Sequence, residues 1–259
     1  VVTTTPGNSG LYGFAVDPTG NMITVDGDTD RILRHWRNTQ VRDEIDIYSL
    51  LPDVSGHHYP GNPDEYGYSP SSVSFDECLD YWVTLYDTIS AIKLSGHTNE
   101  VIASAVPPVV NQLIQSRTQS PSSKWTEDAD FSVNSVHGPQ GRYGENLINP
   151  TVVETCKNND IVVTYTNPVC SFICRYDQLG NHMHTYELGI DRYFTGDVCI
   201  DSSDHIWAVT EGTGLSANGL PDMSPPRGEI YSFDEQLNLR FAVSSLSGTE
   251  YQDMRAPVP

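Results

Sequence analysis

The sequence predicts an all-β protein, a single β-propeller of four-stranded antiparallel blades, because one pattern recurs along the chain. In each copy an apolar strand ends at a polar corner, a turn of three or four residues follows, and a second apolar strand leads into a hairpin. β-Branched and aromatic residues dominate these strands, as they do in pleated sheets. A repeat of four short strands is typical of a propeller blade. The clear copies begin at residues 13–26, 72–85, 151–165 and 197–210.

The spacing of the copies predicts the blades. The four clear copies are expected to form blades over residues 11–48, 71–104, 150–187 and 197–243. The longest gap leaves room for one irregular blade over 107–147, since a blade needs about 40 to 45 residues. We therefore expect five blades in one domain, residues 1–259. Counts of four and six stay open, because prolines interrupt the irregular segment and few alternating runs occur in it.

The two strand tryptophans have a predicted structural role. Trp82 and Trp207 occupy equivalent places in the second strands of their blades. Strands buried between adjacent blades are expected to carry large apolar side chains at such positions. We therefore interpret both tryptophans as packing residues between blades rather than as ligand contacts.

The connections between strands divide unequally between the two ends of the predicted blades. Turns from first to second strand and from third to fourth strand emerge at one face, and the remaining connections emerge at the other. All first-to-second turns are short, whereas the long connections 49–70, about 105–128 and 211–227 share the opposite face. A rigid scaffold with extended loops on one face is a common plan for binding sites.

Candidate ligand-binding residues lie in two of these long connections. Tyrosine and histidine offer contact area and hydrogen bonds at low entropic cost, which suits recognition of sugars or proteins. The alternative is that the aromatic residues pin their loop onto the propeller and the polar residues only cover the surface. The candidates are His57, His58, Tyr59, Tyr66 and Tyr68 in the first loop, and Glu211, Asn218 and Asp222 in the last.

Composition restricts the partners. The formal net charge is −20, from 34 acidic and 14 basic residues. Nucleic acid is not expected as a partner, because phosphate binding needs clustered lysine and arginine. No apolar run reaches the roughly 20 residues that a membrane helix needs, so no membrane insertion is expected. An acidic surface poor in lysine suits high salt, where screening weakens self-repulsion, and equally an ordinary acidic extracellular domain.

A family resemblance adds to these expectations. In residues 196–233 an apolar strand with aspartate and a polar turn leads into Ile206-Trp207-Ala208-Val209-Thr210-Glu211, and residues 13–34 carry a similar phrase. The phrase resembles the blades of NHL, SMP-30/gluconolactonase and virginiamycin B lyase-like propellers, and it covers well under half of the chain. The resemblance implies six or seven blades and an axial divalent metal held by Glu, Asn and Asp of inner strands. Its positional candidates are Glu145, Asn149 and Asp197, whose oxygens would suit calcium or magnesium.

The sequence favours recognition over catalysis. It contains no Gly-x-Ser-x-Gly elbow, no phosphate-binding glycine loop and no His-Glu-x-x-His motif. We expect a module without chemistry or cofactor that binds a cell-surface glycan or protein receptor, as an adhesin, a lectin or, in the favoured reading, a virus spike. Its expected location is extracellular or on a virion surface. The alternatives are a metal-dependent lactonase or lyase using calcium or magnesium, and a structural subunit that contacts other virion or surface subunits.

Overall fold

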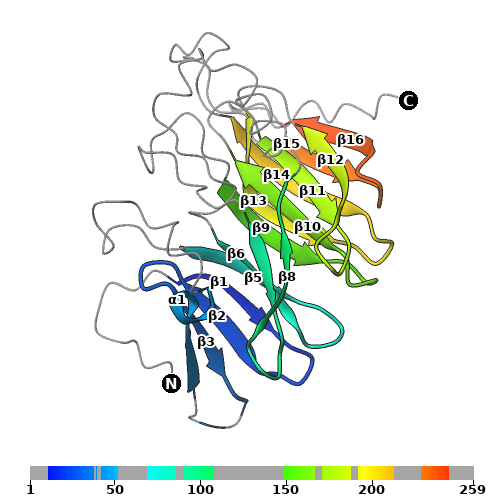
Figure 1. Cartoon of the computed structure of the whole chain (residues 1–259). Helices are drawn as coiled ribbons and strands as arrows, with labels where there is room; N and C mark the ends of the chain where they lie inside the picture. The colour runs from blue at the N-terminus through cyan, green and yellow to red at the C-terminus, as the bar shows by residue number, and fades with distance from the viewer. Residues whose placement is uncertain are drawn as a thin grey trace, which may run out of the picture.

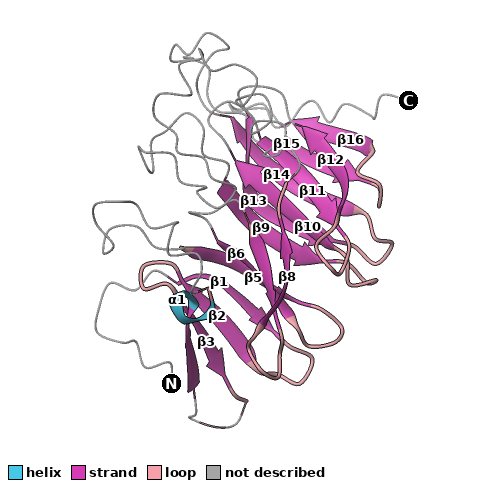
Figure 2. Ribbon diagram, in the orientation of Figure 1, coloured by secondary structure: helices cyan, strands magenta, loops and turns pink. Residues whose placement is uncertain are grey.

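The chain folds as a series of β-meanders. The computed structural model describes residues 11–37, 39, 42–51, 69–85, 90–107, 149–166, 171–187, 192–212 and 229–244. Within these ranges sixteen strands form four antiparallel sheets, and each sheet contains four strands in chain order. The prediction of four-stranded antiparallel blades is confirmed, and each sheet is called a blade from here on (Figure 2).

The strands have the following bounds. Blade 1 contains β1 (Leu11–Val16), β2 (Met22–Asp26), β3 (Arg31–His35) and β4 (Arg42–Asp46). Blade 2 contains β5 (Pro70–Phe75), β6 (Tyr81–Leu85), β7 (Ala91–Leu94) and β8 (Val101–Ala105). Blade 3 contains β9 (Asn149–Thr155), β10 (Ile161–Thr166), β11 (Ser171–Tyr176) and β12 (His182–Glu187). Blade 4 contains β13 (Arg192–Ile200), β14 (Ile206–Gly212), β15 (Glu229–Phe233) and β16 (Leu239–Ser244).

Two strand ends differ from the expected positions. Strand β4 ends at Asp46 because this residue caps the short helix α1 (Ile47–Leu50): its carboxylate accepts a hydrogen bond from the Tyr48 N–H at 3.0 Å. Strand β13 begins at Arg192 rather than at residue 197, and its pairing with β14 shifts register between Phe194 and Val198. No helix of the described residues has the length and apolar character required to cross a bilayer.

Consecutive blades stack face to face. Contacts join β1 and β2 to β5, β5 and β6 to β9, and β9, β10 and β11 to β13. Figure 1 shows the sheets following one another from blade 1 at the lower left to blade 4 at the upper right. No comparable set of contacts joins blade 1 to blade 4 in the described ranges. Blades 2 and 3 are therefore direct neighbours, and the blade predicted over 107–147 lies, after Pro107, outside the described residues.

An apolar cluster fills each interface between neighbouring blades. Ile23 of blade 1 packs with Tyr81 of blade 2, and Trp82 packs with Phe172 of blade 3, all at 0% exposure. The interface of blades 3 and 4 is built in the same way. Both faces of an inner sheet are thus covered, which explains why β6 is apolar and buried along its whole length. The predicted packing role of Trp82 is confirmed.

The tight fit between blades makes Gly180 a sensitive position. Gly180 has a φ of +84°, and an added Cβ would lie 2.1 Å from the backbone oxygen of Ser104 in blade 2. Gly20 has a similar φ of +90°, but its Cβ would meet only the flexible side chain of Arg37. Gly180→Ala should therefore lower the free energy of unfolding in urea more than Gly20→Ala does, by at least about 1 kcal/mol. Equal losses would show that backbone strain alone matters and that the blades can separate here.

Candidate functional site

Six of the connections on one face of the propeller are copies of a single five-residue turn. In each copy the first N–H donates to the fifth carbonyl and the fourth N–H donates to the first carbonyl, as between Asp17 and Asn21 and between Gly20 and Asp17, both at 2.9 Å. The fourth residue has a positive φ, between 59° and 90°. We call these connections the Asp turns. They span 17–21, 76–80, 156–160, 177–181, 201–205 and 234–238.

In the turns that begin with Asp17, Asp177 and Asp234, the first side chain is fully used by the turn itself. One oxygen of Asp177 accepts hydrogen bonds from the Leu179 and Asn181 N–H groups at 2.9 and 2.8 Å, and the other accepts one from the Asn181 amide at 2.8 Å. Slight burial would raise the pKa of the Asp177 carboxyl, but these hydrogen bonds outweigh it and hold the pKa below its usual value. Asp17 and Asp234 are held in the same way.

In blade 3 the turn between the first and second strands begins with Cys156, whereas in the other three blades this turn begins with an aspartate. Burial raises the pKa of the Cys156 thiol to about 12, against a smaller lowering by Arg175. Burial likewise raises the pKa of the Cys174 thiol to about 11. Only a thiolate is a strong nucleophile, and both groups are neutral thiols near pH 7. These two buried cysteines are therefore packing residues rather than reactive groups.

The third strands of blades 1 to 3 each bury a cation at the same register position. These cations are Arg34, Lys93 and Arg175, each at most 7% exposed, and they lie opposite Ile23, Trp82 and Val162 of the second strands. Two of them reach the next blade, since Arg34 donates to the Gly96 carbonyl and Arg175 donates to the Glu235 carbonyl. The cations thus connect each sheet to the Asp-turn face.

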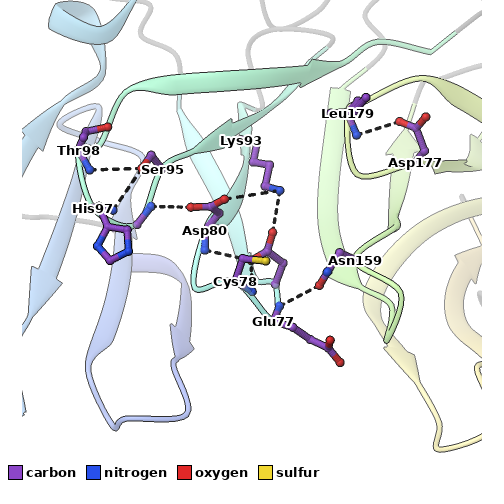
Figure 3. A network of polar contacts seen from close by, with 12 residues as sticks. Glu77, Cys78, Asp80, Lys93, Ser95, His97, Thr98, Asn159, Asp177 and Leu179 are labelled. Carbon is purple, nitrogen blue, oxygen red and sulfur yellow. Dashed lines mark hydrogen bonds and ion pairs between the residues drawn. The ribbon is translucent and has the colours of Figure 1, made fainter.

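The cation of blade 2 is paired with two carboxylates of an Asp turn. The Lys93 Nζ atom lies 2.7 Å from an Asp76 oxygen and 3.8 Å from an Asp80 oxygen. Figure 3 shows Lys93 pointing toward this turn, where Asp80 also accepts a hydrogen bond from the Gly96 N–H at 3.0 Å. The Asp76 side chain is fully buried, and Lys93 is the cation that pairs with it, while its other oxygen accepts hydrogen bonds from the Cys78 and Asp80 N–H groups.

A hydrogen bond between turns joins blades 2 and 3 beside this ion pair. The Asn159 side-chain oxygen accepts from the Glu77 N–H at 2.9 Å (Figure 3). In blade 3, Arg175 repeats the ion pair with Asp160 at 2.9 Å. Charged groups that are buried and paired in this way stabilise a scaffold and have little capacity left to bind a ligand. These carboxylates and cations of the Asp-turn face are therefore used within and between the blades.

The opposite face receives the long connections. Chain segments leave it after Leu51, Pro107 and Gly212 and return at Ser69, Asn149 and Glu229. His57, His58, Tyr59, Tyr66, Tyr68, Asn218 and Asp222 lie on these segments, outside the described residues, as does Glu145. The described strands thus confirm that the short first-to-second turns share one face and that the long connections leave from the other.

Three predicted site residues lie in strands whose backbone is described. Asn149 is the first residue of β9, Asp197 lies at the register shift of β13, and Glu211 is near the end of β14. Strands β9 and β13 contact each other, so the two metal candidates Asn149 and Asp197 belong to adjacent inner strands. Among the residues that the structure describes, no group of three His, Cys, Asp or Glu side chains could hold a metal ion. The metal site stays a prediction.

The sequence analysis missed the buried cations. Arg34, Lys93 and Arg175 each stand within an apolar third strand, and each blade taken alone gives no reason to single them out. Aligning the blades on their first Asp turns would have placed Arg34 and Lys93 at one position, 17 residues after the first turn residue, and Arg175 two residues further on, 19 residues after Cys156. A comparison of the blades could therefore have identified these basic residues, whereas no single motif does.

Comparisons with known proteins identify the fold. No protein-family model matches the chain, and no curated protein matches it in sequence. Hydrazine synthase of Kuenenia stuttgartiensis is similar in structure, with a TM-score of 0.57 and 10% identity over 91% of this chain and 53% of that one. The Dos1 propeller has a TM-score of 0.55 and 8% identity over 92% of this chain and 47% of that one. The chain is a β-propeller.

Other propellers in the comparison are less similar. Virginiamycin B lyase of Staphylococcus aureus matches with a TM-score of 0.45 and 11% identity, over 94% of this chain and 69% of that one. The chain spans about half the length of hydrazine synthase and of the Dos1 propeller. At identities this low the likeness describes the fold alone.

Removal of the buried cation of blade 2 should destabilise the propeller. Lys93→Met leaves the buried Asp76 carboxylate without its partner, so the free energy of unfolding should fall by about 3 to 5 kcal/mol. Lys157→Met removes only an exposed hydrogen bond to the Ser202 carbonyl and should change it by less than about 1 kcal/mol. Chemical unfolding of both variants beside the unmodified chain gives the comparison. A loss for Lys93→Met no larger than for Lys157→Met would contradict the role of the ion pair.

The Asp turns should make the propeller sensitive to acid. Because the pKa values of Asp17, Asp177 and Asp234 lie below the usual value of 3.8, their contribution to stability is complete above that pH and is lost as the pH falls through the folded-state values. The melting temperature should therefore drop steeply below about pH 4. Asp177→Asn and Asp234→Asn together should flatten this drop. An unchanged slope in the double variant would show that other carboxylates control acid unfolding.

Proposed function

We propose that the face carrying the long connections recognises a cell-surface or polymeric ligand, a glycan or a protein, without catalysing a reaction. The observation that carries this proposal is the difference between the two faces of the propeller. The Asp-turn face uses its carboxylates and its buried cations within the scaffold. The strand ends of the other face lead into every long connection of the chain.

The composition of the long connections supports recognition. Residues 52–68 contain two histidines and three tyrosines among glycine and proline, and residues 213–228 add asparagine, aspartate and arginine. These side chains combine flat contact area with hydrogen-bonding groups, which is the usual chemistry of sugar and protein binding. A rigid stack of blades beneath them would hold such loops at low entropic cost.

The acidic surface supports an exposed location in salty surroundings. A net charge of −20 keeps molecules apart at low salt, and screening removes this repulsion at high salt. We accordingly propose an extracellular or virion-surface protein, with a virus spike or an adhesin as the favoured role. A receptor glycan or protein on the target cell is then the partner.

Substitutions in the first long connection should abolish attachment. His57→Ala, Tyr59→Ala and Tyr66→Ala combined should reduce binding to target cells or to a glycan array at least about tenfold, since recognition energy concentrates in a few aromatic contacts. His97→Ala, in an exposed turn of the other face, is the matched control and should leave binding unchanged. Attachment that survives the triple substitution would sink the proposal. Binding that is lost in the unmodified chain on adding a chelator would favour the metal-dependent alternative.

A further inference from the structure

At each end of the series of blades, one face of the outermost sheet is exposed, although the equivalent face of the other sheets is buried. In each of the three described interfaces, one face of a blade packs on the other face of the following blade. We call the face toward the following blade the forward face and the other the rear face. Blade 4 has no following blade among the described residues, and blade 1 has no preceding one.

Equivalent positions show that the rear face of blade 1 is built for an interface. The strand registers align Phe14 of β1 with Val73, Val153 and Val198 of the other first strands. The three valines are 6%, 1% and 4% exposed, because each packs on the preceding blade. Phe14 is 71% exposed, and Val16 on the same face is 55% exposed. A large aromatic side chain thus stands uncovered where the fold normally buries a valine.

The forward face of blade 4 shows the same contrast. Ile230 of β15 occupies the position of Ile173 in β11, yet Ile173 is 0% exposed and Ile230 is 46% exposed. Trp207 occupies the position of Trp82, which is fully buried between blades 2 and 3, whereas Trp207 is only partly buried. Val209, which is 41% exposed, and Phe241, whose ring lies 5.2 Å from the Trp207 ring, extend the apolar surface. Contrary to the sequence-based interpretation, Trp207 has no neighbouring blade to pack on within the described ranges.

We propose that a second copy of this chain covers both faces, so that two copies close one propeller ring. The forward face of blade 4 in each copy would pack on the rear face of blade 1 in the other. This contact would place a forward face on a rear face, as in the three interfaces within the chain, so it repeats an interface that the chain already forms. Head-to-tail contacts of this kind give a closed ring when the rotations between successive copies add up to a full turn.

The number of described blades is consistent with two copies. Within the described ranges one copy does not close on itself, because blades 1 and 4 lie at opposite ends of the series and no comparable set of contacts joins them (Figure 1). Known propellers have typically about 4 to 8 blades. Two copies of the four described blades reach the upper limit of this range, and three copies would exceed it.

Charge sets the condition for this assembly. Each chain carries a formal charge of −20, so two copies repel each other at low ionic strength. Screening shortens the range of this repulsion and leaves the apolar contact unaffected. The dimer should therefore strengthen as salt rises.

The mass of the chain in solution tests the proposal. Light scattering or analytical ultracentrifugation in molar salt should give twice the 28.7 kDa chain mass, with a monomer at low salt or high dilution. Ile230→Glu and Phe14→Lys should each raise the dissociation constant at least about tenfold, because each places a charge in the contact. Leu179→Glu, at a 66% exposed turn away from both faces, is the control and should dimerise normally.

Mixing the variants separates head-to-tail closure from any other dimer. A pair of Ile230→Glu with Phe14→Lys has one unmodified contact and one that joins opposite charges, so the mixture should recover the dimer that each variant alone has lost. A chain that stays monomeric at its highest soluble concentration in high salt would overturn the proposal. So would a dimer that either variant leaves intact, or one that the mixture does not restore. Circular dichroism on each variant confirms that the fold is retained.

Discussion

The structure depends on one constraint, which is that a sheet with two apolar faces must be covered on both. Blades 2 and 3 meet this constraint inside the chain, and their second strands are accordingly buried from end to end. Each interface excludes water from large side chains such as Trp82 and Tyr165, and this burial is the main stabilising contribution of the fold. Turns, cations and loop placement all follow from the need to stack sheets closely.

Close stacking also explains the polar chemistry of the Asp-turn face. A hairpin that must stay short has to satisfy its own N–H groups. The aspartate at the first position accepts them with one oxygen, and its other oxygen accepts from the side-chain amide of Asn21. The buried cations of the third strands then tie these turns to the sheet interior and, through Gly96 and Glu235, to the next blade. The aspartates that begin these turns are therefore part of the scaffold, whereas Glu77 and Glu235 beside them are exposed.

The sequence predicted local features well and relations between blades poorly. Alternating apolar residues located the strands within a few residues, and the aspartates located the turns, because both signals are local. The extension of β13 to Arg192 was missed, since it depends on pairing across a register shift with β14. Trp82 and Trp207 look identical in sequence but differ in burial, because burial depends on whether another blade follows. Of the candidate site, strand positions such as Asn149 could be assigned, whereas the long connections carry no repeating pattern.

Each blade is a meander of consecutive strands, and this connectivity has a consequence for how the chain folds. Nearly all pairing within a sheet joins neighbouring strands, so a blade can form before the rest of the chain is available. Local contacts of this kind favour rapid folding. During synthesis the forward face of blade 1 would be covered as soon as residues 69–105 have emerged, and each finished blade then offers the next a ready surface. The propeller can thus grow in one direction along the chain, like the addition of units to a solenoid.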